Sequence, residues 1–517
     1  MKKRTGFTQI VMVIITIIAI TASMVLNGSS AVAQPGVNPG ENPNLPDPNL
    51  PDPDLSDLHL PNQTLTAGLL SGIRAYIYGY PLVMMGITQR LTTNVPNLAT
   101  LGRAPKNQFA HATALPNASY VDVQLPNVNT LYSLAFLDLS TEPIILHLPD
   151  MGTRFFLLEV LDAWTNVNPN SPGTRSGTPA GNYAFVGPQW QGSLPGGITQ
   201  VYTMPTSTMW IIGRIYTDGS QQDIAYIDNN LHPNMTLTPL SSFGQPYTPP
   251  ATSPIDPATD SVTIPFVQAG DMDACAFFGM LAALMIYNPP VPADTQAVGW
   301  LADIGVTPGE TFSCSTLTST QRAELQTAVR IGNAIVTSAS QHVSPPENGW
   351  QLTLGLGIYG TQYLVRAAVA RVGLGTNYYL DAVYAGAFVD GTGQTLNGAN
   401  RYTLHFDAGQ FPPSNPQAFW SVTMYNAELL NLVDNSINRN ALGIPAVQAH
   451  VPCLNDDGSL TLYIQTDPPD PTTQPTQYCN WLPAPEGNFL LLMRIYWPDQ
   501  TLLDQQWVPP GVQQVSQ

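Results

Sequence analysis

Polar residues that could bind an oxygen-rich ligand occur at the ends of predicted strands in the first half of the chain. Arginine forms bidentate hydrogen bonds with oxyanions, amides and hydroxyls add further hydrogen bonds, and tryptophan offers a stacking face. Because loops at one end of a β-sandwich converge, we expect these side chains to share a pocket. The candidate ligand-binding residues are Asn127, Asn129, Tyr132, Asp162, Trp164, Thr165, Asn166, Arg175 and Arg214.

Asp162 is the one candidate catalytic residue in this group. It would act as a base in a hydrolase or lyase of carboxylate type, with Arg175 or Arg214 holding an anion. Such chemistry needs a partner acid or a desolvated aspartate. Glu159 is close in sequence, but strand alternation would place Glu159 and Asp162 on opposite faces. The sequence therefore leaves open whether the protein is an enzyme.

The same arginines also have a structural interpretation. Only 10% of the residues are charged, so each arginine could be tied to a nearby carboxylate that fixes a loop. The pairs that sequence proximity suggests are Arg154 with Asp150, Arg175 with Asp162, and Arg214 with Asp218. A similar group in the C-terminal part is interpreted as structural, because FWSVTMY is typical of a core strand. Its members are Trp420, Tyr425, Asn435, Arg439, Asn480 and Trp481.

Common catalytic and metal-binding motifs are absent from the sequence. It contains no G-x-S-x-G, no H-E-x-x-H, no P-loop and no G-x-G-x-x-G after a strand. The seven histidines show no spacing typical of metal ligands, and the four cysteines lie too far apart for a zinc site. The segment NDDGSL at Asn455 lacks the ligands of a calcium loop and predicts a β-turn. We expect no metal and no cofactor.

The elements that must position the candidate residues follow from hydrophobic periodicity. Helical spacing predicts helices over 64–93, 271–287 and 318–342 and a helical region over 361–385 that ends near the breakers Gly373–Gly375. Short apolar or alternating runs predict strands over 119–239 and 386–506. Pro81 should break or kink the first helix. Ser319 or Thr320 should cap the third helix, with Glu324 in its first turn.

Several longer motifs carry a family resemblance that spans roughly residues 67–510. In the first half they are PNVNTLYSLAFLDLS at Pro126, DAWTNV at Asp162 and PGTRSGT at Pro172. In the second half they are FWSVTMYN at Phe419, DGSLTLYIQ at Asp457, NWLPAP at Asn480 and RIYWP at Arg494. Together they resemble the tandem family of two domains of unknown function, DUF1254 and DUF1214. The resemblance implies no chemistry, and it implies an Asp at the position of Asn129.

The spacing of apolar residues and the family resemblance together predict an α+β, multi-domain protein. Helical segments would be combined with tandem antiparallel β-sandwich, jelly-roll-like domains. The predicted divisions are a signal peptide at 1–33, a disordered leader rich in Pro, Asp and Asn at 34–61, a DUF1254-like domain at 62–250, a helical connecting region at 251–385, and a DUF1214-like β domain at 386–517.

The N-terminus predicts export. Basic residues, the apolar run IVMVIITIIAI and an A-x-A site ending at Ala33 are the parts of a secretory signal peptide. No later segment could span a membrane. We therefore expect a periplasmic or extracellular protein with no membrane contact after cleavage. The formal charge of −18 argues against nucleic acid as a partner, because phosphate binding needs clustered Lys and Arg.

Export makes disulfides plausible for the four cysteines. Three pairings are open. We favour Cys275 with Cys314 and Cys453 with Cys479, because each pair closes a short loop.

The function predicted from sequence is binding of a small or polymeric polar ligand, such as a glycan, or a structural role. The alternative is the Asp162 enzyme described above. Assembly into homo-oligomers is a third interpretation that the sequence leaves open, as it does ligand identity and metal dependence.

Overall fold

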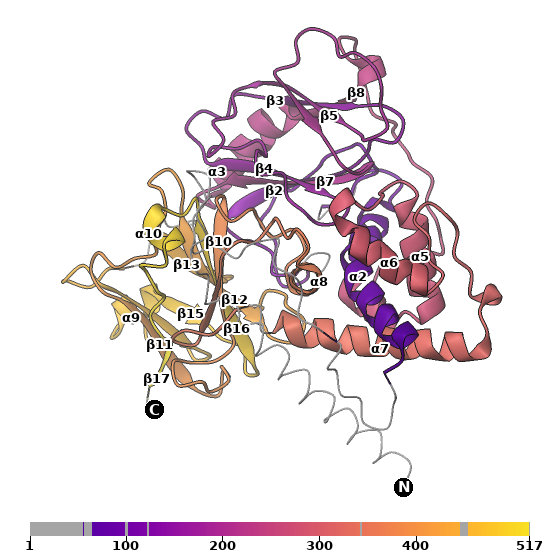
Figure 1. The fold of residues 1–517 in the computed structure, drawn as a ribbon. Helices are drawn as coiled ribbons and strands as arrows, with labels where there is room; N and C mark the ends of the chain where they lie inside the picture. The colour runs from indigo at the N-terminus through magenta and orange to yellow at the C-terminus, as the bar shows by residue number, and fades with distance from the viewer. Residues whose placement is uncertain are drawn as a thin grey trace, which may run out of the picture.

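Three parts make up the structure, a computed structural model: an N-terminal β-sandwich, a layer of helices and a C-terminal β-sandwich (Figure 1). The protein is therefore a mixed α+β, multi-domain chain, as predicted. The predicted signal peptide and, apart from Leu55, the predicted leader lie outside the described residues. Within the described part, no helix is long and apolar enough to cross a membrane. The structure describes Leu55 and residues 65–98, 102–120, 124–341, 344–444 and 453–515.

The N-terminal sandwich consists of two four-stranded sheets. Its strands are β1 (Ala110–His111), β2 (Thr130–Asp138), β3 (Ile144–Leu148), β4 (Phe156–Asp162), β5 (Gly181–Val186), β6 (Gln200–Thr203), β7 (Thr208–Tyr216) and β8 (Thr236–Pro239). One sheet has the order β1-β2-β7-β4 and the other β6-β5-β3-β8. Neighbouring strands are antiparallel except for β5 and β6. Apolar side chains from both sheets fill the space between them.

The C-terminal sandwich consists of one five-stranded and one four-stranded sheet. Its strands are β9 (Trp350–Thr353), β10 (Ala382–Ala387), β11 (Arg401–Phe406), β12 (Trp420–Asn426), β13 (Ala441–Ile444), β14 (Leu460–Gln465), β15 (Trp481–Pro483), β16 (Phe489–Tyr496) and β17 (Gln513–Val515). The orders are β13-β12-β16-β10-β9 and β15-β14-β11-β17, and only β14 and β15 run parallel. A second apolar core lies between these sheets.

The inner sheet of each sandwich is buried on both faces. In β7, Ile211 and Ile215 point into the sandwich core, whereas Trp210 and Ile212 pack against the helical layer. The sequence of a strand that is covered on both faces is almost continuously apolar, as it is in MWIIGRIY of β7 and FLLLMRIY of β16. The polar residues in these two runs therefore lie in buried surroundings rather than in water.

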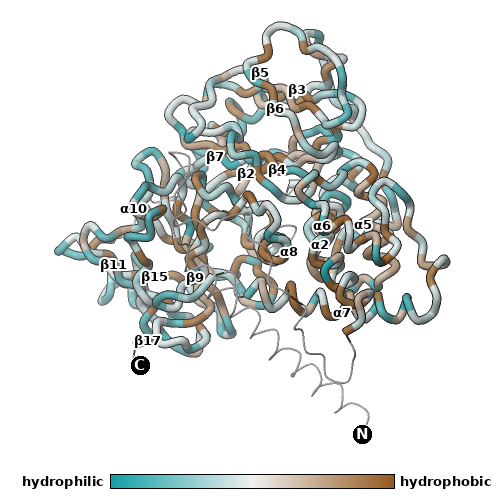
Figure 2. Tube along the Cα trace, viewed as in Figure 1, coloured by the Kyte–Doolittle hydropathy of each residue, from teal (hydrophilic) through white to brown (hydrophobic). Residues whose placement is uncertain are grey.

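Helix α2 (Ala67–Thr93) lies at the centre of the helical layer (Figure 1). It packs against α4, α5, α6, α7 and α8. Gly79 permits the close contact with α5, since a Cβ at this position would lie 2.4 Å from the side chain of Leu281. Figure 2 shows hydrophobic residues along α2 and α5 and hydrophilic ones in the outer loops. The other helices are α3 (Gln221–Tyr226), α4 (Pro265–Asp271), α5 (Ala274–Met285), α6 (Thr295–Asp303), α7 (Ser319–Ser340), α8 (Tyr363–Val372), α9 (Pro475–Cys479) and α10 (Gln500–Leu503).

The helix ends differ from the predicted ones. α2 continues through Pro81, so the predicted break is wrong. The helix predicted over 271–287 corresponds to α5 (Ala274–Met285), which begins later than predicted because Asp273 is its N-cap, and Asp271 is the last residue of α4. α7 is capped by Thr318, which forms a capping box with Gln321. The predicted caps Ser319 and Thr320 are therefore wrong, and Glu324 lies beyond the first turn.

The helical region predicted over 361–385 contains α8, which ends at Val372 with Gly373 as its C-cap, so the end predicted near Gly373–Gly375 is confirmed. The final residues of that range belong to β10 and are not helical. β10 pairs with β9 and β16 and is at least partly covered on both faces, so its sequence AVYAGA lacks the alternation that marks a half-exposed strand. The two preferred disulfides, Cys275–Cys314 and Cys453–Cys479, are confirmed.

Candidate ligand-binding site

A cavity lies between the inner sheets of the two sandwiches and the C-terminal end of α8. It offers about 140 Å³ to the centres of water-sized molecules and is partly open. A closed apolar cavity of about 150 Å³ holds one benzene-sized molecule, so this cavity, which is partly open, suits a small molecule. Its lining is mostly apolar and includes Leu134, Trp210, Ile212, Val369, Leu374, Phe388 and Leu492.

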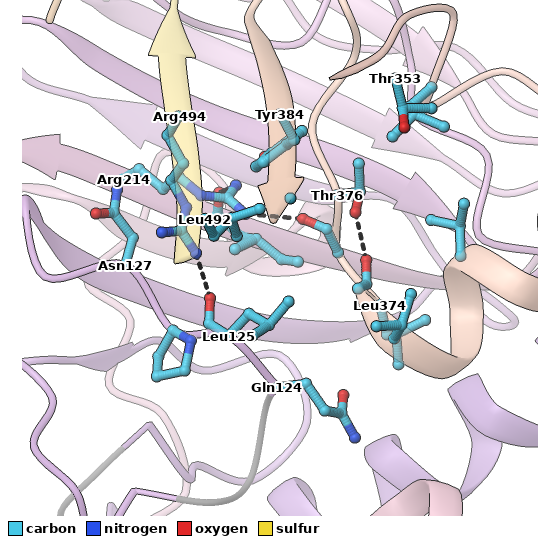
Figure 3. A pocket seen from close by; sticks show the side chains of 18 of the residues that line it. Gln124, Leu125, Asn127, Arg214, Thr353, Leu374, Thr376, Tyr384, Leu492 and Arg494 are labelled. Carbon is cyan, nitrogen blue, oxygen red and sulfur yellow. Dashed lines mark hydrogen bonds between the residues drawn. The ribbon is translucent and has the colours of Figure 1, made fainter. Parts of the chain in front are cut away.

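Two buried arginines reach the cavity from the two inner sheets (Figure 3). Each belongs to an Arg-Ile-Tyr sequence, at Arg214 in β7 and at Arg494 in β16. In both strands the following isoleucine points into its own sandwich core. Because side chains alternate along a strand, the arginine is turned to the opposite face, toward the cavity. The two domains thus supply equivalent cations from corresponding strand positions.

Arg494 carries a charge that no carboxylate balances in the described part of the chain. Its side chain donates to Thr423 Oγ1 at 3.2 Å and to the carbonyl oxygen of Leu125, both uncharged. The groups that interact with it electrostatically are tyrosines, foremost Tyr425, whose ring centroid lies 5.5 Å from the guanidinium carbon. Arg494 is only 3% exposed. An unpaired buried charge is costly, so its presence at a cavity needs an explanation.

Arg214 is paired beneath the cavity with Glu159 of β4. Its Nη1 lies 3.0 Å from Glu159 Oε2, and its Nη2 donates to the carbonyl oxygen of Gly375 at 2.8 Å. The other carboxyl oxygen of Glu159 accepts the Tyr378 amide at 2.7 Å. Burial raises the pKa of Glu159 to about 8, although Arg214 opposes the rise, and Asp381 adds to it.

A second ion pair lies beside Glu159. Arg175 donates to both carboxyl oxygens of Asp381, at 2.7 and 2.8 Å. Burial raises the pKa of Asp381, while Arg175 and then Arg214 oppose the rise. This pair joins a loop of the first domain to the segment that enters β10, so Arg175 is bound to protein rather than directed into the cavity.

Two other buried arginines, outside the cavity lining, have different surroundings. Arg439 donates to the backbone oxygens of Tyr478, Cys479 and Trp481. Arg366 is enclosed by aromatic rings, those of Tyr78, Trp164 and Tyr363, at 5.2–5.6 Å from its guanidinium carbon. Neither residue lines the cavity. Among the arginines that the structure describes, Arg494 is therefore the one that lines the cavity without a carboxyl group as hydrogen-bond partner.

Neutral polar groups complete the wall near the arginines. Asn127 donates to the Tyr496 hydroxyl at 2.8 Å, and its backbone amide donates to the Tyr132 hydroxyl at 2.7 Å. Tyr384 donates to Asn377 Oδ1 at 2.6 Å. Gln124 also lines the cavity, and its buried Nε2 has no hydrogen-bond partner. These groups provide hydrogen bonds beside the two guanidinium groups.

The structure brings together only some of the candidate residues from the sequence. Asn127, Tyr132 and Arg214 line the cavity. Tyr132 and Arg214 do so from the face of the sheet that is turned away from the sandwich core, and Asn127 from the segment just before β2, not from converging loops at the end of a sandwich. Asn129 lies next to this group, and its buried Oδ1 has no partner.

The DAWTNV segment is a buried turn away from the cavity lining. Asp162 accepts from the backbone amide and the side chain of Asn166, both at 2.9 Å. Trp164 donates to the backbone oxygens of Asn288 and Pro289. Thr165 takes the strained positive φ of 71°. Burial raises the pKa of Asp162, with the bonds from Asn166 opposing the rise.

The ion pairs suggested by sequence proximity are wrong. The three arginines bind Asp223, Asp381 and Glu159 instead of Asp150, Asp162 and Asp218. The sequence pointed to Glu159 only as a partner acid for Asp162, and it gave no indication of Arg494, Tyr384 and Tyr496 as residues of the site. The repeated Arg-Ile-Tyr was the available signal for Arg494. Among the described residues, no group of three His, Cys, Asp or Glu could hold a metal ion.

Outside the cavity, His111 and His232 form a buried stacked pair with ring centroids 4.4 Å apart. Burial, and then His232, lowers the pKa of His111 to about 3, and burial also lowers that of His232. The unfolded chain therefore binds more protons below about pH 6.5. We expect the free energy of unfolding to decrease as the pH falls from about 6.5 toward 3.

Urea titrations at neutral and acidic pH would measure this decrease. The loss should be smaller in His111→Phe, whereas His405→Phe, a change on an exposed strand face, should keep the wild-type pH dependence. Equal acid sensitivity in all three proteins would contradict the role of the histidine pair.

Comparisons with known proteins identify domains and a structure of similar fold, but none of these matches has an assigned activity. The family described as protein of unknown function DUF1254 matches residues 106–239, and that described as DUF1214 matches 381–500. The crystal structure of the VPA0106 protein from Vibrio parahaemolyticus is similar, with a TM-score of 0.61 and 22% identity over 87% of this chain and 100% of that one. The crystal structure of an uncharacterised protein from Burkholderia cenocepacia is less similar, with a TM-score of 0.39 and 11% identity over 87% of this chain and 94% of that one. No curated protein matches.

Proposed function

Because the chain belongs to the tandem DUF1254/DUF1214 family, whose descriptions name no chemistry, we propose a function from the cavity itself. The protein binds a small molecule that has an acid group and an apolar body. The observation that carries this proposal is Arg494, a buried cation at the wall of a mostly apolar cavity that has no carboxylate partner in the part of the chain that the structure describes.

The two ends of the ligand match two regions of the cavity. An acid group placed between Arg214 and Arg494 would supply the negative charge that Arg494 lacks. Charge-assisted hydrogen bonds of this kind are about twice as strong as neutral ones. The apolar body would then lie against Leu374, Val369 and Ile212. Ligand sites with apolar walls and a few convergent polar groups are typical of small-molecule binding.

The dimensions favour a small ligand over a polymer. A partly open cavity of about 140 Å³ suits an aromatic or medium-chain carboxylic acid, part of which can extend through the opening. A hydrolase or lyase based on Asp162 gains no support, since Asp162 lies outside the cavity lining and is bonded to Asn166. The two disulfides and the absence of a membrane-spanning helix from the described residues support the proposal that binding takes place in an exported, oxidising compartment.

Isothermal titration calorimetry tests the proposal with octanoate, phenylpropanoate and the neutral control octanol. We expect at least one of the acids to bind, and octanol to bind at least about tenfold more weakly than octanoate, because it cannot neutralise Arg494. Failure of both acids to bind at any pH, or equal binding of octanol and octanoate, would reject the proposed function.

Filling the cavity should block binding without changing its charges. Gly386 lines the cavity, and a Cβ there would lie 3.9 Å from Phe388 and 4.0 Å from Leu492, which is ordinary contact. Gly386→Leu should therefore fold and place its side chain in the cavity. We expect octanoate affinity to fall at least about tenfold by calorimetry, because the leucine side chain occupies space that the ligand needs.

Gly386→Ala is the matched control for this variant and should bind within about threefold of wild type. Unchanged octanoate affinity in a folded Gly386→Leu protein would show that the ligand lies elsewhere.

A further inference from the structure

The Glu159–Arg214 pair lies directly behind the proposed anion position. Glu159 is 0% exposed and Arg214 is 6% exposed. Arg214 lines the cavity, whereas Glu159 does not. We infer that Glu159 couples binding of the acid to uptake of a proton. This inference rests on the proposed function and adds its regulation by pH.

The charges that face Glu159 come from several elements. Arg214 belongs to β7, Arg175 to the loop after β4, and Asp381 to the segment before β10. Tyr359, Tyr384 and Tyr496 interact with it more weakly and are themselves held neutral, since burial raises their pKa values. Together with Arg494, the described residues of the site and of the two ion pairs behind it include three guanidinium groups and two carboxyl groups. With both carboxyl groups ionised, these five groups carry one excess positive charge.

An incoming acid changes this balance at Arg214. That guanidinium would then lie between two carboxylates, one from the ligand and one from Glu159 at 3.0 Å. Like charges that share one site in a low-dielectric interior favour protonation of one of them. Glu159 is the carboxyl that gains the proton, because it is fully buried and already has a pKa of about 8. The bond formed is a carboxyl O–H on Glu159, and the proton comes from solvent.

The linkage between ligand binding and protonation of Glu159 determines how the affinity changes with pH. Below pH 8 Glu159 already holds the proton, so affinity should be nearly constant there until the ligand itself becomes protonated. Above pH 8 the free protein loses the proton that the complex retains. Affinity should then fall by up to about tenfold per pH unit.

Calorimetry in paired buffers tests this inference. Octanoate or phenylpropanoate would be titrated from about pH 6.5 to about pH 9.5, in two buffers that differ in ionisation enthalpy. At the upper end, wild type should take up close to one proton per bound acid, and its Kd should increase. Glu159→Gln, which keeps the shape and loses the charge, should bind with an almost constant Kd and take up no proton.

A control variant and the possible contrary results distinguish acid binding, the proposed function, from proton uptake by Glu159, the inference. Asp138→Asn removes a surface carboxylate that is paired with Lys106 at 3.4 Å and should keep the wild-type behaviour. Binding without proton uptake in wild type would reject the inference but not the proposed function, and it requires no variant to fold. Uptake that persists in Glu159→Gln would assign the proton to another group and also reject it. Failure of both acids to bind would reject the proposed function and the inference together.

Discussion

Replacing Arg494 with methionine should lower the affinity for octanoate at least about 100-fold, which corresponds to about 3 kcal/mol. Methionine keeps an unbranched chain of similar length, but it removes the buried cation of the cavity that has no carboxylate partner among the described residues. The acid group would then have to leave water for a site with a single guanidinium group, that of Arg214, which is already bonded to Glu159 and Gly375. Calorimetry on the purified variant would measure the loss.

The variant should nevertheless fold. Methionine loses the hydrogen bonds to Thr423 and Leu125, but it also removes the cost of an unpaired buried charge. These effects oppose each other, so we expect the free energy of unfolding to change by less than about 2 kcal/mol. Arg494→Lys keeps the charge without the planar fork and should bind with intermediate affinity. Wild-type affinity in Arg494→Met would contradict the assigned role.

Trp164→Ala should have the largest effect on stability and little on the site. The side chain is 2% exposed, and its ring packs against Tyr78 at 4.7 Å and faces the Arg366 guanidinium. Truncating a buried tryptophan typically costs about 3–5 kcal/mol. Denaturant unfolding should show a loss of this size, whereas octanoate affinity of the folded protein should stay within about threefold of wild type.

Trp190→Ala is a suitable control, because Trp190 is only partly buried beside a small outer cluster and should cost less. Large loss of octanoate affinity in folded Trp164→Ala, with little loss of stability, would instead favour the stacking role that the sequence suggested.

The parts of the fold that were predictable from the sequence are those set by local patterns. Alternating and continuous apolar runs indicated the strands, and the spacing of the cysteines indicated both disulfides. The strand β10 was not predictable, because its burial on both faces depends on partners more than 100 residues away, such as Met493 opposite Ala385.

The site illustrates the same limit. Asn127, Tyr132 and Arg214 could be identified as candidates from their residue types. The pairing of Arg175 with Asp381 could not, because it joins positions 206 residues apart. Arg494 could be recognised only by noticing that Arg-Ile-Tyr occurs in both domains, and its missing counter-charge is visible only in three dimensions.

A crystal structure with octanoate brominated at its terminal carbon would test the central claim most directly. We predict an anomalous bromine peak beside Leu374 and Val369, with the carboxylate between Arg214 and Arg494. Bromine at the arginines, or a cavity that stays free of the acid at a concentration that saturates binding in solution, would contradict the account.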